Sequence, residues 1–206
     1  MKDVWVVTHT ESFHHVKRLG GGWYDTHLTE KGKKDAQRIA LKLYERIKKK
    51  EIPIISSDLK RCTDMAESFK TVFSGSFETD SRLREMGYGV AEGKAQKWQQ
   101  EHIQPRPIDN NRIDHRVFGG AESRRDIGQR ITNFVNDKLA NIENTVLVIT
   151  HGFALTFIIM AWMNIPVVNM DYCNFSSFPG GVTQLREDDF FGNKTLVSLN
   201  DMSFIS

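Results

Sequence analysis

The sequence lacks the features that mark several special classes of protein. It has only two cysteines among 206 residues, Cys62 and Cys173, which is too few for a disulfide framework or a four-cysteine metal site. Its longest strongly apolar run, at residues 153–163, is about half as long as a membrane-spanning helix needs to be. We therefore expect reduced cysteines, no membrane partner and a cytoplasmic location.

An excess of charge of either sign is also missing. The 28 Lys and Arg residues against 26 Asp and Glu leave a formal net charge of +2, and the longest basic run is the triplet at residues 48–50. Proteins that bind nucleic acid through its phosphates usually carry a basic patch or stripe. The sequence thus predicts no nucleic-acid partner, and the triplet is interpreted as the solvated end of a helix.

Short β-rich runs alternate with longer helical patterns along the chain. Strands are predicted at residues 4–8, 52–56 and 146–150, with an extended segment at 77–79 and a hairpin of 182–185 with 196–199. Helices are predicted at 29–50, capped by Thr29, then after Ser57 or Asp58, from Ser123 onward, and at 152–163. This alternation predicts an α/β fold, a three-layer α/β/α sandwich with a mostly parallel sheet.

The length predicts a single domain over residues 1–206. Residues at about 94–120 are polar, contain two prolines and show no sustained apolar period, so they are predicted to form an insertion beside the sheet. Such segments often act as lids or substrate loops. Neither the oligomeric state nor the identity of a substrate follows from these patterns.

Polar residues follow three of the predicted strands. His9 comes after the first, Ser56 and Ser57 lead to Arg61 after the second, and His151 comes after the strand at 146–150. In open α/β sheets the ligand crevice lies at the carboxyl ends of the strands. A neutral imidazole can attack phosphorus, while a guanidinium and a cationic imidazole can hold phosphoryl oxygens. The sequence therefore predicts a site for phosphate chemistry.

The blocks around these residues form an ordered pattern along the chain. They are residues 8–12 (THTES), 22–25 and 28–32 (GWYD and LTEKG), 56–61 (SSDLKR), 83–87 with 92–93 (LREMG and EG), and 149–152 (ITHG). In this order they resemble the signatures of the histidine phosphatase superfamily, the phosphoglycerate mutase-like enzymes, including its Arg-His-Gly-Glu-Thr/Ser and Ser-x-Leu-x-Arg blocks. The resemblance extends over nearly the whole chain.

This resemblance implies a phosphoglycerate mutase-like fold and a phosphatase that needs no metal or other cofactor. It implies that His9 is the nucleophile that forms a phosphohistidine, that Arg61 and His151 bind the phosphoryl group, and that Glu85 donates a proton. The chemistry of the residues agrees, because an alkoxide leaving group needs a proton and a partly buried carboxyl group can supply it. The expected partner is a phosphorylated small molecule.

The first block departs from the family pattern. Thr8 stands where the family has arginine before the nucleophile, and Thr10 stands where it has glycine after it. Losing one charged donor typically costs about 10²–10³ in rate. His15 and Arg18 are the candidates to contact phosphate together with Thr8. The adjacent histidines 14 and 15 lack the i, i+4 spacing of a metalloprotease motif, so no metal site is predicted.

Two other functions are compatible with the sequence. One is a phosphoglycerate-type mutase, which shares the catalytic blocks but must keep water from the phosphohistidine. The other is a non-catalytic protein that binds phosphate or a nucleotide. The predicted insertion carries side chains that would form a cationic, partly aromatic wall for a phosphorylated acid or a nucleotide, namely Trp98, His102, Arg106, Arg112, His115 and Arg116.

Overall fold

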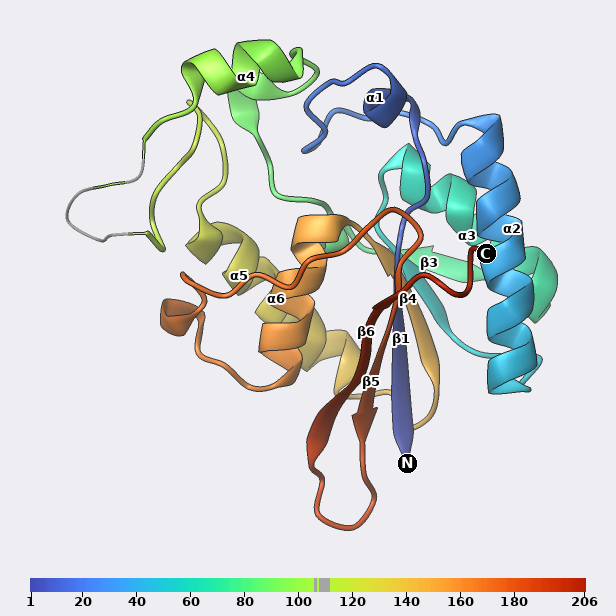
Figure 1. Cartoon of the computed structure of the whole chain (residues 1–206). Helices are drawn as coiled ribbons and strands as arrows, with labels where there is room; N and C mark the ends of the chain where they lie inside the picture. The colour runs from blue at the N-terminus through green and yellow to red at the C-terminus, as the bar shows by residue number, and fades with distance from the viewer. Residues whose placement is uncertain (106, 108–111) are drawn as a thin grey trace.

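A six-stranded mixed sheet forms the middle layer of the computed structural model, which describes residues 1–105, 107 and 112–206 (Figure 1). Its strands are β1 (Lys2–Thr8), β2 (Ile54–Ser56), β3 (Phe77–Thr79), β4 (Val146–Thr150), β5 (Val182–Glu187) and β6 (Lys194–Asp201). The order across the sheet is β3-β2-β4-β1-β5-β6. The first four strands in this order pair in parallel, whereas β5 is antiparallel to β1 and forms the predicted hairpin with β6 at the sheet edge.

Helices cover both faces of the sheet (Figure 1). They are α1 (Phe13–Val16), α2 (Glu30–Ile47), α3 (Lys60–Phe73), α4 (Gln96–His102), α5 (Arg124–Phe134) and α6 (Gly152–Trp162). Side chains alternate along β1, so Val4 and Val6 pack in the cluster that contains α5 and α6, while Trp5 and Val7 pack in the cluster that contains α2 and α3. The predicted three-layer α/β sandwich is therefore confirmed.

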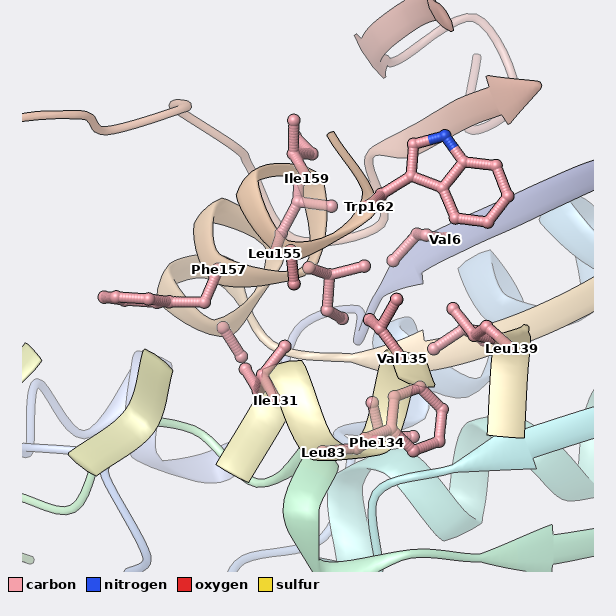
Figure 2. Packing of buried hydrophobic residues seen from close by; sticks show 14 of the residues in the cluster. Val6, Leu83, Ile131, Phe134, Val135, Leu139, Leu155, Phe157, Ile159 and Trp162 are labelled. Atoms are coloured by element: carbon pink, nitrogen blue, oxygen red, sulfur yellow. The ribbon is translucent and has the colours of Figure 1, made fainter. Parts of the chain in front are cut away.

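Helix α6 lies in the core on almost all its sides. Its residues from Ala154 to Trp162 are buried, and Leu155 and Ile159 belong to the same cluster as Ile131 and Phe134 on the neighbouring helical segment (Figure 2). Burial of such a side chain typically contributes about 1.5–3 kcal/mol. This packing fixes the N-terminus of α6 at the carboxyl end of β4. The first backbone N–H groups of the helix have no partner within the helix itself.

The predicted starts of two helices are confirmed and that of a third is wrong. Thr29 accepts a hydrogen bond from the backbone N–H of Gly32, and Ser123 is the N-cap of α5. Helix α3 instead begins at Lys60 after Leu59. The two residues predicted as caps of this helix have other partners. The Ser57 hydroxyl lies 2.9 Å from His151 Nε2, and the Asp58 carboxylate accepts two hydrogen bonds from Arg84.

The predicted insertion consists of the short helix α4 and loops that lie above the carboxyl ends of the parallel strands, near α1 (Figure 1). Arg106 falls outside the described residues. Within the described ranges, none of the helices combines the length and the hydropathy that a membrane span requires.

Candidate active site

The carboxyl ends of β1, β4 and β2 bring three predicted side chains into contact. His9 follows β1, His151 follows β4, and Arg61 lies in the first turn of the helix after β2. Arg61 Nε lies 3.2 Å from His9 Nε2 and 3.2 Å from His151 Nδ1. All three side chains are buried. Their proximity follows from the sheet, since β2, β4 and β1 are neighbours in it.

Arg61 is held by backbone carbonyls as well as by the two histidines. Its two terminal nitrogens donate to the carbonyl of Gly22 at 2.7 Å and of Tyr24 at 3.0 Å. Gly22 has φ +52, and a Cβ there would lie 3.0 Å from the backbone nitrogen of Tyr88. Burial lowers the pKa of Arg61, but a guanidinium stays charged at neutral pH. The contacts fix one cation beside His9.

The hydrogen bonds of His9 define its tautomer. Its Nδ1 lies 2.9 Å from the carbonyl oxygen of Thr10. Because a carbonyl can only accept, Nδ1 carries the proton and Nε2 carries the lone pair, which accepts a hydrogen bond from Arg61 Nε. Burial, assisted by the charge of Arg61, lowers the pKa of His9 well below its usual value. His9 is therefore a neutral imidazole whose Nε2 lone pair faces Arg61, and an unprotonated nitrogen is what attack on phosphorus requires.

His151 is fully buried next to Arg61, and it is not among the residues that line the cavity described below. Its Nδ1 accepts from Arg61 Nε, and its Nε2 lies 2.9 Å from the Ser57 hydroxyl. Burial lowers the pKa of His151 well below its usual value. The neighbouring Cys62 is no thiolate nucleophile, since burial raises the pKa of its thiol to about 12.

Glu85 lies where its carboxylate meets the N-terminus of α6. It accepts hydrogen bonds from the backbone N–H groups of Phe153 and Ala154, both at 3.0 Å, and from that of Met86 at 2.9 Å. These bonds favour the ionised form, but burial has the larger effect and raises the pKa of Glu85. A carboxyl group with a raised pKa can act as a proton donor.

The backbone around Glu85 is held by an ion pair that the sequence analysis missed. Arg130 on α5 lies 2.8 Å from Glu122 and donates to the carbonyls of Arg82, Arg84 and Glu85. A single arginine on an amphipathic helix resembles a surface charge in the sequence, so only the tertiary structure identifies this contact.

His9, Arg61 and Glu85 line a common cavity of about 190 Å³. It is lined by Thr8, His9, His14, His15, Gly21, Gly22, Arg61, Glu85, Tyr88, Gly152, Ser177, Phe178 and Pro179. One neutral imidazole, one fixed cation and one carboxyl group of raised pKa thus face the same space. This combination fits transfer of a phosphoryl group.

Comparison with known proteins agrees with this arrangement. A model of the histidine phosphatase superfamily (branch 1) matches residues 4–202. The chain belongs to this superfamily. A Proteus mirabilis protein named "Probable phosphoglycerate mutase GpmB" is 33% identical over 170 residues, which are 81% of this chain and 77% of the relative. The family resemblance and the phosphoglycerate mutase-like fold expected from the sequence are confirmed.

Solved structures share the same fold over the whole chain. YhfR from Bacillus stearothermophilus superposes with a TM-score of 0.79 at 26% identity, covering 100% of both chains. A mycobacterial glucosyl-3-phosphoglycerate phosphatase in complex with VO3 also has a TM-score of 0.79, at 23% identity, with 97% of this chain and 99% of that chain covered. A further structure of this mycobacterial phosphatase is a complex with inorganic phosphate, and it has a TM-score of 0.76 at 22% identity.

The loop after β1 carries the residues at which the sequence analysis predicts a departure from the family pattern. The Thr8 hydroxyl donates to the carbonyl of Phe178 at 2.7 Å, and the side chain is buried. His14 and His15 line the cavity with their ring centroids 4.2 Å apart, and the ring of His15 stacks on that of His9. Arg18 is exposed and is not among the cavity-lining residues.

Burial disfavours the charged form of both loop histidines. Burial lowers the pKa of His14 to about 3 and also lowers the pKa of His15. His14 faces the cavity although only His15 was proposed as a phosphate contact. The sequence showed His14 next to the candidate His15, but the direction in which the His14 side chain points depends on the helix α1.

A second cavity, of about 570 Å³, shares Tyr88 with the first one and has a mostly apolar lining. Its described lining residues are Met86, Tyr88, Gln96, Gln99, Gln100, Ile103, Val117, Phe118 and Phe153. Of the predicted cationic wall, Arg112 and His115 line a neighbouring cavity instead, and Arg116 is paired with Asp126. The rings of Trp98 and His102 stack on each other, with centroids 4.0 Å apart.

Proposed function

We propose that this histidine phosphatase superfamily member is a phosphomonoester phosphatase that acts on a small phosphorylated metabolite through a phosphohistidine. The observation that carries the proposal is the tautomer of His9, whose Nδ1 donates its proton to the Thr10 carbonyl while Nε2 keeps an unprotonated lone pair directed at Arg61. A nucleophile prepared in this way needs no metal ion for activation.

In the first step, His9 Nε2 attacks phosphorus and the bond from phosphorus to the alcohol oxygen breaks. Arg61 holds phosphoryl oxygens, and Glu85 gives its proton to the leaving oxygen. In the second step, Glu85 takes a proton from water, the water oxygen attacks the phosphohistidine, and phosphate leaves with His9 restored. We assign His151 to accepting the Arg61 Nε–H, which holds the guanidinium next to His9 and the phosphoryl group.

The loop residues complete the phosphate site in this proposal. His15 stands over His9 and offers an imidazole N–H to a phosphoryl oxygen in place of the missing arginine. The Thr8 hydroxyl is engaged by Phe178, so we assign Thr8 to fixing the cavity wall. Arg18 lies too exposed on the loop for us to give it a role in the unliganded site.

The apolar cavity favours hydrolysis of a phosphomonoester over a phosphoglycerate-type mutase. Its lining includes Tyr88, Phe118 and Phe153, and its described lining contains no lysine or arginine to hold a carboxylate. An alcohol portion that lies against Tyr88 would extend from the catalytic cavity into this space. A relative named as a phosphoglycerate mutase keeps the mutase as the second candidate.

The test is phosphate release by the purified chain with an excess of chelator. The substrates are p-nitrophenyl phosphate, naphthyl phosphate and 3-phosphoglycerate, and a parallel assay follows interconversion of 2- and 3-phosphoglycerate. We expect release from the aryl phosphates and no interconversion. Interconversion without release would establish the mutase, and no turnover with retained vanadate binding would establish a non-catalytic binder.

A further inference from the structure

Three histidines of the cavity stand close enough together to share one ligand. His9, His14 and His15 each place a ring nitrogen within 4.8 Å of the other two. His9 and His14 are buried and His15 is half-buried, and all three line the same cavity. No part of the proposed hydrolysis requires His14.

Each of the three rings is fixed through its Nδ1. His9 Nδ1 donates to the Thr10 carbonyl at 2.9 Å, and His14 Nδ1 lies 2.9 Å from the hydroxyl of Ser12 and 3.1 Å from that of Thr26. Nδ1 of His15 accepts from the backbone N–H of Ser12 at 3.3 Å and lies 3.4 Å from the hydroxyl of the same serine, so binding a metal through Nε2 requires the His15 proton to move to Nδ1 and face that hydroxyl. Imidazoles that bind metals are usually held in this way at the nitrogen that does not ligate.

The other nitrogen, Nε2, is then the one available to a ligand in the cavity. Nε2 of His14 faces Gly21, where a Cβ would stand 3.0 Å away, so the glycine leaves space in front of this nitrogen. Gly21 itself lines the cavity. The tautomer of His9 leaves the lone pair on its Nε2, which accepts from Arg61 Nε in the unliganded cavity.

We propose that His9, His14 and His15 form a binding site for a divalent transition-metal ion, Zn²⁺ above all, and that this ion inhibits the enzyme reversibly by occupying the nucleophile. Imidazole nitrogen suits Zn²⁺, Cu²⁺ and Ni²⁺, and three histidines with one open position form a known tetrahedral zinc arrangement. With bonds of about 2.1 Å the ligand nitrogens would lie about 3.4 Å apart, so the rings, whose nitrogens lie within 4.8 Å of one another in the unliganded cavity, would move together on binding.

Arg61 opposes this site and sets the conditions for its occupation. Arg61 Nε donates to both His9 Nε2 and His151 Nδ1. When a metal ion takes the lone pair of His9 Nε2, the hydrogen bond to His151 Nδ1 remains. The other nitrogens of Arg61 stay bound to the two loop carbonyls. An anionic fourth ligand, such as hydroxide, offsets the guanidinium charge. Metal and phosphoryl group are mutually exclusive, because each needs the same Nε2.

The binding test uses the full chain, stripped by chelator, without any substrate. Co²⁺ is added and its visible absorption is followed, and Zn²⁺ affinity is measured by competition with a chromogenic chelator. We expect one ion per chain and a four-coordinate Co²⁺ spectrum. His14→Gln and His15→Gln should each weaken binding by at least about tenfold. His27→Gln is the matched control, because His27 is exposed and pairs only with Asp64 among the acidic residues described; its affinity should equal that of the parent.

The inhibition test adds Zn²⁺ to the aryl phosphatase assay. The half-inhibiting concentration should match the affinity measured without substrate, inorganic phosphate should raise it, and excess chelator should restore the rate. The inhibitory part rests on the proposed function, whereas the Co²⁺ spectrum does not, so a protein without phosphatase activity still decides the metal site. No bound ion, parent-like affinity in both variants, or full turnover with the ion bound would each overturn the proposal.

Discussion

The catalytic cavity has two halves that differ in how they are held and in what charge they carry. The strand-end half consists of His9, Arg61 and His151, which adjacent strands bring together and which contact one another directly. The loop half consists of His14 and His15 on the short helix α1 after β1, and burial lowers the pKa of both. The family resemblance leads us to expect a second guanidinium beside His9, where this chain has imidazoles. The comparison indicates that Arg61 supplies the permanent charge and that burial disfavours charge on the loop imidazoles.

Removing the nucleophile tests the strand-end half and should have the largest effect. We expect His9→Ala to lower turnover by at least about 10⁴-fold, since the residues of a catalytic unit act together. The fold should persist, as judged by circular dichroism, because a residue at the rim of the sheet fills little of the core. Rapid-quench labelling of the parent should trap acid-labile, base-stable phosphate on this histidine. Normal turnover by the variant would remove His9 from the mechanism.

Glu85→Gln should separate substrates by their leaving groups. An alkyl phosphate needs a proton on its departing oxygen, so its kcat/KM should fall by about 10²–10⁴, while p-nitrophenyl phosphate should lose much less. The measurement is kcat/KM on both substrates with the same enzyme preparation. Equal losses on the two substrates would show that Glu85 is not the acid.

Substitutions at His15 and Thr8 test whether the loop half replaces an arginine. His15→Ala should lower kcat/KM by about 10²-fold, and adding Thr8→Arg to it should recover part of the loss, because a guanidinium can bind phosphoryl oxygens in bidentate fashion. Thr8→Arg alone should reduce activity, since it crowds the loop imidazoles and repels Arg61.

Arg18→Asn is the control for this cycle, because asparagine tolerates the positive φ of +51 at that position and Arg18 is exposed. It should change kcat/KM by less than about twofold, below roughly 0.5 kcal/mol. A severe loss in Arg18→Asn would mean that the loop closes on the substrate and that the cation comes from there. Parent-like activity in all the loop variants would mean that the cavity works with Arg61 alone.

The pH profile should show a gradual change in rate rather than a single loss. His9 acts as a neutral base whose pKa is lowered, so it stays unprotonated well below pH 6.5, and Glu85 acts as an acid whose pKa is raised, so it stays protonated above the usual carboxyl range. For alkyl phosphates kcat/KM should therefore be highest at mildly acidic pH and fall about tenfold per unit above the pKa of Glu85. Glu85→Gln should abolish this alkaline decline, and an alkaline optimum in the parent would contradict the assignment.

Much of the strand-end half was predictable because strands and blocks are local patterns. The apolar run of β4 was predicted at the residues where it occurs, and the alternation of β1 places its side chains on two faces of the sheet. Parallel strands end at one edge, so His9, Arg61 and His151 could be placed near one another. The roles of these residues remain predictions.

The tertiary structure decided the features that depend on contacts between distant segments. The start of α3, the clamp of Arg130 on the backbone of Glu85 and the apolar cavity beside Tyr88 each depend on side chains brought together from separate parts of the chain. The cationic wall predicted for the insertion does not form as expected for the same reason, because Arg116 pairs with Asp126 on α5.

The sequence by itself determined the order of elements, the alternation of buried side chains and the identity of the strand-end residues, because these depend on near neighbours and on the pleat of each strand. Only the tertiary structure decided the direction of His14, the exposure of Arg18 and the tautomer of His9. These depend on the turn at α1 and on the carbonyl that each ring meets, so no residue pattern alone encodes them.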